Sequence, residues 1–271
     1  KGKSTIYPTL FFVCFSLATY QAAKLLTPLV FILFITIYWA DFWHRFTPYL
    51  KSKKIFFVLP FILFSLWILL GSIFSTAGNR LSVQSIFSYK PGVSAATKAI
   101  DGQGSIQTPL FHNQTQLTTS LVLSRYLYHF SPEVLFYEGP VIEERDHIPS
   151  LGVLHPLEMI WLIFGIIYLV KLLPDKRTLL ILGLLLLSPI PGSLTLAEFS
   201  THRALFMAVP LSIISGIGMY YCIEKLKLFS IPIFLIYALV SIHVFDVYFL
   251  HSQVVFAKEF NYGYKQAVQI I

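Results

Sequence analysis

Charged residues are scarce in this chain. Asp, Glu, Lys and Arg make up only 12% of its 271 residues, whereas 56% are hydrophobic and 16% are aromatic. A soluble domain carries roughly 25% charged residues, so this composition, together with long apolar runs, excludes an ordinary water-soluble enzyme. The sequence therefore indicates an integral membrane protein, whose first partner is the lipid bilayer.

Cysteine and the common catalytic motifs are also scarce or missing. The two cysteines, Cys14 and Cys222, both fall within apolar segments, which excludes a disulfide framework and gives no zinc-ligand spacing. The sequence contains no Walker A loop, no Rossmann glycine pattern and no GxSxG elbow. The motifs that mark a P-loop, a dinucleotide-binding site or an α/β-hydrolase are thus missing.

Seven apolar runs are candidates for membrane spans, because a bilayer core of about 30 Å needs roughly 20 helical residues. We predict an all-α polytopic membrane protein with about seven transmembrane helices, some short or broken. Thr27 and Pro28 resemble an N-cap followed by proline at the first helical position. The first two runs, joined around Lys24, are expected to form a hairpin or one broken helix. The runs cover approximately Ile6–Ala23, Thr27–Trp43, Ile55–Phe74, His155–Leu173, Thr178–Pro189, Arg203–Ile223 and Phe229–Leu250.

The Lys and Arg residues behind the formal net charge of +7 are unevenly distributed along the chain. With the N-terminus in the cytoplasm, the cytoplasmic segments hold eleven of the twenty Lys and Arg residues, and the positive-inside rule favours that orientation. Topology thus explains most of the positive charge, and no nucleic-acid partner is predicted. We expect a multi-pass protein of the plasma membrane with its large loop and C-terminal tail outside. The eleven residues are Lys1, Lys3, Arg45, Lys51, Lys53, Lys54, Lys171, Lys176, Arg177, Lys225 and Lys227.

One large extracytoplasmic loop, about 75–154, interrupts the predicted transmembrane domain, 1–250. Within this loop, Thr115–Gly139 carries apolar and aromatic residues at helical spacing, which predicts a helix lying on the membrane surface. Residues 251–271 are expected to begin a truncated extracytoplasmic C-terminal region. Because the chain starts at Lys1 and stops at Ile271 in a polar-aromatic stretch, we expect it to be part of a longer protein.

Ionisable residues near the membrane mark the candidate site, because they are costly at membrane depth. His155 and Glu158 are three residues apart and share one helix face. They form either a hydrated helix cap or the polar wall of a substrate cavity. Glu198, His202 and Arg203 follow a short fifth run whose prolines and glycine end the helix. Arg203 either binds a phosphate through its planar fork or extends to the interface.

Histidines complete the set of candidate residues. His243 and Asp246 are again three apart, and mutual hydrogen bonding within a buried pair is the favoured interpretation. Five histidines on the predicted outer side could supply ligands for a divalent metal ion together with Glu158 or Glu198, but no two have HxxxH spacing. No metal ion and no other cofactor is therefore predicted. The five are His112, His129, His147, His155 and His202.

Three stretches of the sequence together carry a resemblance to one family of membrane proteins. The first is FFVCFSLATYQAAKLLTPLVFILF (Phe11–Phe34), the second is HFSPEVLFYEG (His129–Gly139) followed by RDHIPSLGVLHPLE (Arg145–Glu158), and the third is LLLLSPIPGSLTLAEFSTHRALFMAVP (Leu184–Pro210). In this order they resemble a membrane segment, an outer-loop pattern, and a PIPA-x-LT turn with the His and Arg that follow it, in bacterial glycosyltransferase family 39 proteins. This family belongs to the GT-C superfamily together with the protein O-mannosyltransferases.

The resemblance implies an integral membrane glycosyltransferase. Such an enzyme transfers a sugar, with inversion, from a polyprenyl-phosphate donor to an extracytoplasmic protein or glycolipid acceptor. The resemblance also implies an acidic catalytic base upstream of Lys1, so no catalytic residue is expected in this segment. Cationic groups would stabilise the departing phosphate, and carboxylates and histidines would bind sugar hydroxyls. The expected substrate-binding residues are Arg145, His147, His155, Glu158, Glu198, His202 and Arg203.

Two other interpretations stay open. An O-antigen-ligase-like enzyme, or another polyprenyl-linked glycan transferase, would share the outer cationic residues but would use an oligosaccharide diphosphate as its donor. A non-enzymatic transporter or scaffold needs a polar path through the bilayer, whereas the charges of this chain cluster near one interface. The identity of the donor separates the first alternative from the family 39 prediction. Transfer of a lipid-linked sugar to an acceptor, as opposed to its flux across the membrane, separates an enzyme from a transporter.

Overall fold

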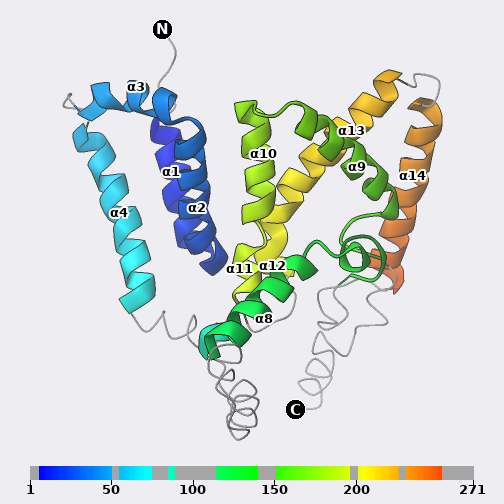
Figure 1. Cartoon of the computed structure of the whole chain (residues 1–271), viewed down its shortest axis with the longest axis horizontal. Helices are drawn as coiled ribbons and strands as arrows, with labels where there is room; N and C mark the ends of the chain where they lie inside the picture. The colour runs from blue at the N-terminus through cyan, green and yellow to red at the C-terminus, as the bar shows by residue number, and fades with distance from the viewer. Residues whose placement is uncertain are drawn as a thin grey trace, which may run out of the picture. The chain divides into compact units, whose positions relative to one another are not determined.

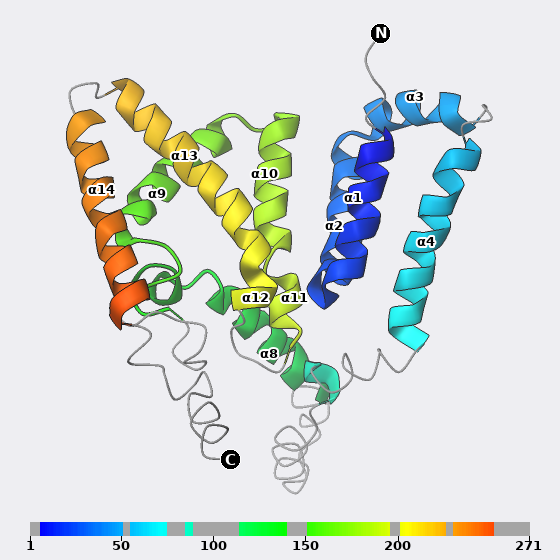
Figure 2. The ribbon, with the colours of Figure 1, turned by 180° about the vertical axis from the view of Figure 1, so that it is seen from behind.

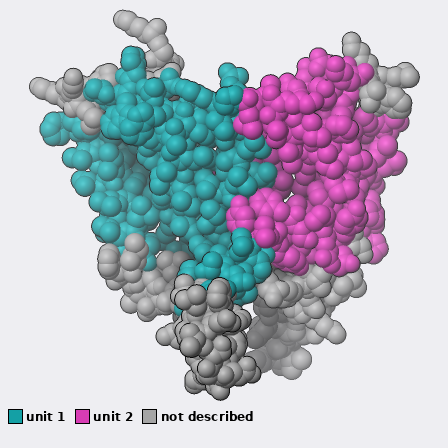
Figure 3. Space-filling view, viewed as in Figure 1, with its two compact units in different colours: residues 1–125, 174–197 teal, residues 126–173, 198–271 magenta. Residues whose placement is uncertain are grey.

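The computed structural model describes residues 6–50, 55–74, 85–88, 114–139, 151–195, 201–225 and 230–251. Within these ranges the chain is mostly helical, as the sequence predicts, and a bridge of extended backbone pairs Ser85 with Thr195. The chain divides into two compact units, coloured separately in Figure 3. The first comprises Lys1–Arg125 and Pro174–Ala197, and the second Tyr126–Leu173 and Glu198–Ile271.

The first unit contains α1 (Ile6–Thr19), α2 (Gln21–Ile37), α3 (Trp39–Leu50), α4 (Ile55–Phe74), α10 (Lys176–Leu187) and α11 (Ile190–Ser193). The predicted hairpin is confirmed: α1 and α2 lie side by side (Figures 1 and 2), and extended backbone at Tyr20 separates them. The hydroxyls of Ser16 and Thr27, 3.0 Å apart, join α1 to α2. The Cys14 thiol lies 3.2 Å from the Ser65 hydroxyl, which joins α1 to α4.

The second unit is built around α9 (Pro156–Lys171) and α13 (Ala208–Lys225), the two described helices that pack together most extensively. The short helix α12 (Thr201–Ala204) and the 3₁₀ turn η4 (Leu205–Met207) lead into α13. The unit also contains the π-helical turn η2 (Glu133–Tyr137) and α14 (Ser230–Asp246), which continues as the π-helical turn η6 (Val247–His251). The stretch predicted to form a surface helix is helical as α8 (Gln114–Tyr128), of which the residues up to Arg125 are assigned to the first unit and the last three to the second.

Three helical stretches of the described residues are long and apolar enough to cross a membrane: Ile55–Ser72, His202–Lys225 and Ile231–His251. They correspond to the third, sixth and seventh predicted runs. Much of their apolar surface faces outward; the Phe234 side chain, for example, is 72% exposed. Such surface is suited to contact with lipid. The other predicted runs form shorter helices, and α10, with 12 residues, spans only about 18 Å at 1.5 Å per residue.

The prediction for the second run, Thr27–Trp43, is wrong at both ends. The helix begins at Gln21, so Lys24 lies inside it and Pro28 is an interior residue rather than the first helical position. Pro28 is tolerated because its missing N–H removes only one bond of the helix and a neighbouring helix packs nearby. The helix ends at Ile37, and Trp43 belongs to the separate helix α3.

The start of α10 was also misplaced by the sequence analysis. Asp175 is its N-cap, because the carboxylate accepts hydrogen bonds from the backbone N–H groups of Arg177 (3.0 Å) and Thr178 (3.3 Å). The helix therefore starts at Lys176, two residues before the predicted boundary. Its end at Leu187 agrees with the prediction that prolines stop it, although Ile190–Ser193 adds one further helical turn as α11.

Two glycines bring α9 and α13 into close contact. A Cβ atom at Gly165 of α9 would collide with the backbone carbonyl of Ile214, and one at Gly218 of α13 would collide with that of Trp161. Small residues at the contact of two helices let the backbones approach closely, which is the usual basis of helix association in membranes. The packing of this pair therefore requires glycine at both positions.

Gly165→Ala is expected to lower the free energy of unfolding by about 1–3 kcal/mol, because the added methyl group forces the two backbones apart. Gly216→Ala is the matched control on α13, where a Cβ meets nothing within 4 Å. Alanine is favoured over glycine in a helix by up to about 1 kcal/mol, so this control should be neutral or stabilising. Reversible unfolding in mixed micelles measures both variants. Equal stabilities would contradict the close α9–α13 contact.

Candidate functional site

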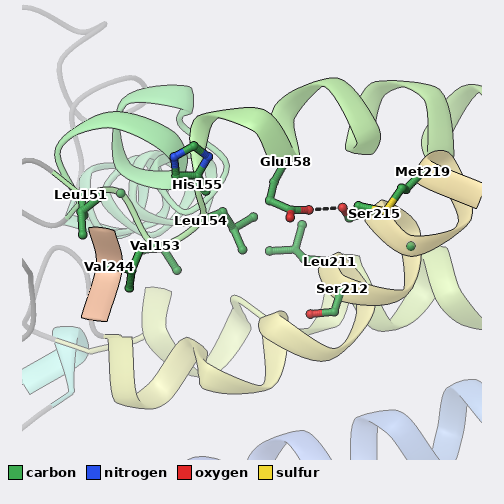
Figure 4. Close-up of a pocket in the computed structure, with 12 residues that line it drawn as sticks. Leu151, Val153, Leu154, His155, Glu158, Leu211, Ser212, Ser215, Met219 and Val244 are labelled. Carbon is green, nitrogen blue, oxygen red and sulfur yellow. Dashed lines mark hydrogen bonds between the residues drawn. The ribbon is translucent and has the colours of Figure 1, made fainter. Parts of the chain in front are cut away.

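A cavity of about 490 Å³ lies within the second unit (Figure 4). Residues 151–155 and Glu158 form one wall, α13 forms another, and Val244 of α14 closes the side. This volume falls within the range of about 300–1,000 Å³ that is typical of small-molecule sites. The walls are mainly apolar, with few polar groups. The α13 residues are Leu211, Ser212, Ser215, Gly216 and Met219.

Backbone hydrogen bonds hold the segment that leads into α9. The amide of Val153 donates to the carbonyl of Val134 (3.2 Å), and the amide of Leu154 donates to that of Leu135 (2.6 Å). Gly152 passes so close to the backbone of η2 that a Cβ atom there would lie 2.5 Å from the carbonyl carbon of Phe136. These contacts fix the position of the cavity wall immediately before His155.

His155 is the N-cap of α9. Its Nδ1 accepts a hydrogen bond from the backbone N–H of Leu157 (3.2 Å), and Pro156 occupies the first helical position. Because Nδ1 is an acceptor, the proton of the neutral imidazole lies on Nε2, which stays available as a donor. Burial lowers the pKa of His155, and the negative charge of Glu158 opposes this shift. Burial and the hydrogen bond that Nδ1 accepts thus both favour the neutral imidazole.

Glu158 lies three residues further on, in the first turn of α9, and two hydroxyl groups hold its carboxylate. The Ser215 hydroxyl of α13 donates to Oε2, the bond drawn in Figure 4, and the Tyr237 hydroxyl of α14 donates to Oε1 (2.8 Å). Hydrogen bonds to an ionised group are stronger than those between neutral groups. The carboxylate thus joins α9, α13 and α14 at the cavity.

The arrangement can bind a molecule that carries hydroxyl groups. A carboxylate offers about four acceptor positions, and the two protein hydroxyls occupy two of them. The remaining positions can accept hydrogen bonds from a ligand in the cavity. Nε2 of His155 adds a donor, and the apolar walls strengthen each polar contact by excluding water.

Of the predicted site residues that the structure describes, two come together at the cavity. His155 and Glu158 both line it, as a polar cavity wall requires, and His155 is also the helix cap that the alternative interpretation expects. His202 and Arg203 belong to α12, where His202 is exposed and Arg203 is half-buried, and neither lines the cavity. Arg145, His147 and Glu198 lie outside the described residues.

The predicted pairing of Asp246 with His243 is wrong. The Asp246 carboxylate instead lies 3.4 Å from Nδ1 of His251, which the π-helical turn η6 brings back toward it. His243 acts on the electrostatics of His155. Among the described residues, no three His, Cys, Asp or Glu side chains come together as a metal site would require.

The two hydroxyl donors, Ser215 and Tyr237, were not among the predicted site residues. Each is a single polar residue in an apolar run, and such residues are common in helices that bury only part of their surface. One signal was present: Ser215, Gly216 and Gly218 form a cluster of small residues on one helix, which is typical of a helix contact. No comparable signal marked Tyr237.

Tyr237→Phe removes one hydrogen bond to Glu158 and is expected to lower the free energy of unfolding by about 1–2 kcal/mol, within the range for bonds to charged groups and between membrane helices. In a Glu158→Met background the same change should have little effect, because the acceptor is gone. Unfolding of the four proteins gives the coupling energy. Tyr220→Phe, at an exposed position on α13, is the control. An equal effect of Tyr237→Phe in both backgrounds would show that the bond contributes nothing.

Comparison with known proteins gives no relative: no family model, curated protein or solved structure matches the chain.

Proposed function

We propose that this protein is a membrane glycosyltransferase that takes a sugar from a polyprenyl-phosphate carrier, and that the cavity of the second unit binds the sugar. The observation that carries the proposal is the Glu158 carboxylate, which two hydroxyls hold at the wall of a cavity among apolar helices. Carboxylates bind sugar hydroxyls well because each oxygen accepts more than one hydrogen bond. The three stretches that resemble family 39 supply the reaction class.

The membrane arrangement that accompanies this proposal follows the distribution of charge. We infer that the N-terminus is cytoplasmic, that the shorter helices of the first unit also lie in the bilayer, and that about seven segments cross or enter it. The cavity lies at the N-terminal end of α9, which then opens toward the extracytoplasmic side of the plasma membrane. That side is where a translocated lipid-linked sugar meets a protein or glycolipid acceptor.

The proposed reaction is a displacement at the anomeric carbon. An acceptor oxygen forms a bond to this carbon from one face, the bond to the phosphate oxygen breaks on the other, and the phosphate leaves with the electron pair. The acceptor proton goes to an acidic base, which the resemblance assigns to a loop upstream of Lys1. Glu158 therefore has a binding role, since Ser215 and Tyr237 already occupy one acceptor position on each oxygen.

Cationic residues are assigned to the phosphate in this proposal. Arg203 can donate two parallel hydrogen bonds to phosphate oxygens, and charge that accumulates on the leaving group is stabilised by such donors. Arg145, His147 and His202 are further candidates by their positions in the sequence, and Glu198 is assigned to a sugar hydroxyl. In this proposal, cationic residues recognise the phosphate of the donor, and the apolar cavity with its one carboxylate recognises the sugar.

Glu158→Gln is expected to reduce sugar transfer about 10- to 100-fold. The reason is that a hydrogen bond to a charged acceptor contributes about 1.5–3 kcal/mol, and this variant removes the charge. The assay follows a radiolabelled sugar from its polyprenyl-phosphate carrier to acceptor, in membranes that contain the full-length protein. Glu224→Gln is the matched control, since Glu224 is exposed at the far end of α13 and does not line the cavity.

The outcomes of this assay separate the competing functions. Unchanged transfer by Glu158→Gln removes the cavity from the active site. Transfer from an oligosaccharide-diphosphate donor, with none from the monophosphate, favours a ligase-like enzyme. Movement of the labelled compound across the vesicle membrane without transfer favours a transporter.

Arg203→Ala is expected to lower transfer from the polyprenyl-phosphate donor while leaving membrane insertion intact. The loss should exceed about tenfold, because removal of a donor to a developing negative charge costs on the order of 3 kcal/mol. Lys171→Ala, at an exposed position in the last turn of α9, is the charge-matched control. If Arg203→Ala transfers sugar as fast as its control, Arg203 is not part of the phosphate site.

A further inference from the structure

α3 connects two apolar helices without being a span itself. It runs across the ends of α2 and α4, which extend from it in the same direction (Figures 1 and 2). α4 contains the apolar stretch Ile55–Ser72, which is long enough to cross a membrane. A helix that lies across the end of a span is placed at the level of the lipid headgroups.

One face of α3 is aromatic. At 100° per residue, its large apolar side chains fall within about one third of the helix circumference, and the polar residues fall on the opposite side. The rings contact one another along this face: Trp39 with Trp43 (5.5 Å between centroids) and Phe42 with Phe46 (5.2 Å). The described apolar side chains of this face are Trp39, Phe42, Trp43 and Phe46.

The aromatic face is directed toward the spans. The ring of Phe42 meets the ring of Phe31 edge-on, 6.2 Å away, and Phe31 lies within α2 rather than at its end. The Trp39 side chain is 57% exposed and that of Trp43 is 39% exposed. The indole rings of Trp39 and Trp43, on the same face of α3 as Phe42, are thus partly exposed.

The polar face of α3 is held by an ion pair. Nζ of Lys176, the first residue of α10, lies 2.8 Å from the Asp41 carboxylate and 5.4 Å from the centre of the Tyr38 ring. Both partners of the ion pair are about half exposed, so its own contribution to stability is small. The ion pair shows that Asp41 faces α10, on the side of α3 opposite to the aromatic face.

We propose that α3 binds the phospholipid surface, with Trp39 and Trp43 at the boundary between headgroups and acyl chains and with a preference for anionic headgroups. Tryptophan favours this boundary because its ring is apolar while its N–H remains a donor. The charge of the region fits anionic lipid: α3 carries Arg45, Arg177 follows Lys176 at the start of α10, and the sequence continues after α3 as Lys51, Ser52, Lys53, Lys54.

A fluorescence experiment on the intact chain tests this placement. The parent for the test is Trp67→Phe/Trp161→Phe, which leaves Trp39 and Trp43 as its only tryptophans. The protein is reconstituted in vesicles whose phosphatidylcholine is brominated either near the headgroup or near the chain end. We expect stronger quenching by the shallow bromine. Stronger quenching by the deep bromine would instead make α3 the end of a span, and no quenching by either would remove it from the lipid.

Energy transfer from the same tryptophans to dansyl-labelled lipid tests the headgroup preference. Transfer to labelled phosphatidylglycerol should exceed transfer to labelled phosphatidylcholine at equal mole fraction, and high salt should reduce the difference. Equal transfer to the two lipids would overturn the anionic preference. No energy transfer to either labelled lipid would show that lipid does not contact this face and would overturn the proposal.

A charge-matched pair of variants separates a local effect from a general one. Arg45→Gln/Arg177→Gln should reduce the phosphatidylglycerol preference severalfold, since each basic residue near an anionic surface contributes about a factor of five in binding. Lys171→Gln/Lys225→Gln removes two positive charges at the ends of α9 and α13 and should leave the preference unchanged. Equal losses in the two variants would overturn a site at α3.

Discussion

The close approach of α9 and α13 is the constraint on which the candidate site depends. Glu158 lies two helical turns before Gly165, and Ser215 lies three residues before Gly218, so each polar residue shares a face with the glycine of its own helix. The glycines bring the backbones together, and the same approach brings the serine hydroxyl to the carboxylate. Packing and site formation therefore require the same pair of helix faces, and a helix shift at the glycines would also break the polar contact.

The Glu158 carboxylate also helps to hold α14 against α9. Most of the apolar side chains of α14 face outward, so burial of apolar surface does little to hold this helix. Tyr237 is different, because its hydroxyl reaches Glu158 on α9. In a lipid environment a hydrogen bond between helices contributes only modestly to stability, but a carboxylate left without donors there is costly. The hydrogen bond from Tyr237 to Glu158 therefore chiefly restricts the positions that α14 can take.

The sequence predicted those features that depend on neighbours along the chain. The apolar run 55–74 matches α4 at both ends, and His155 and Glu158, which the sequence places near one end of a helix, both lie at the start of α9 and line the cavity. The donors Ser215 and Tyr237 lie 57 and 79 residues from Glu158, and helical periodicity carries no information about such distant partners. The prediction that paired His243 with Asp246 failed for a local reason: a π-helical turn changes the spacing and brings His251 to the carboxylate instead.

Hydropathy also could not separate α2 from α3, and the reason is chemical. Aromatic residues count as apolar in a window average, so the run that ends at Trp43 resembles a single span. Phenylalanine and tryptophan, however, are suited both to the membrane interior and to its interface, and only their arrangement around the helix distinguishes the two. In α3 the aromatic residues share a face while Asp41 lies opposite, and its partner Lys176 is held at the start of α10 by the Asp175 cap. The cap of one helix thus helps to decide the orientation of another, a relation that no pattern within 27–43 contains.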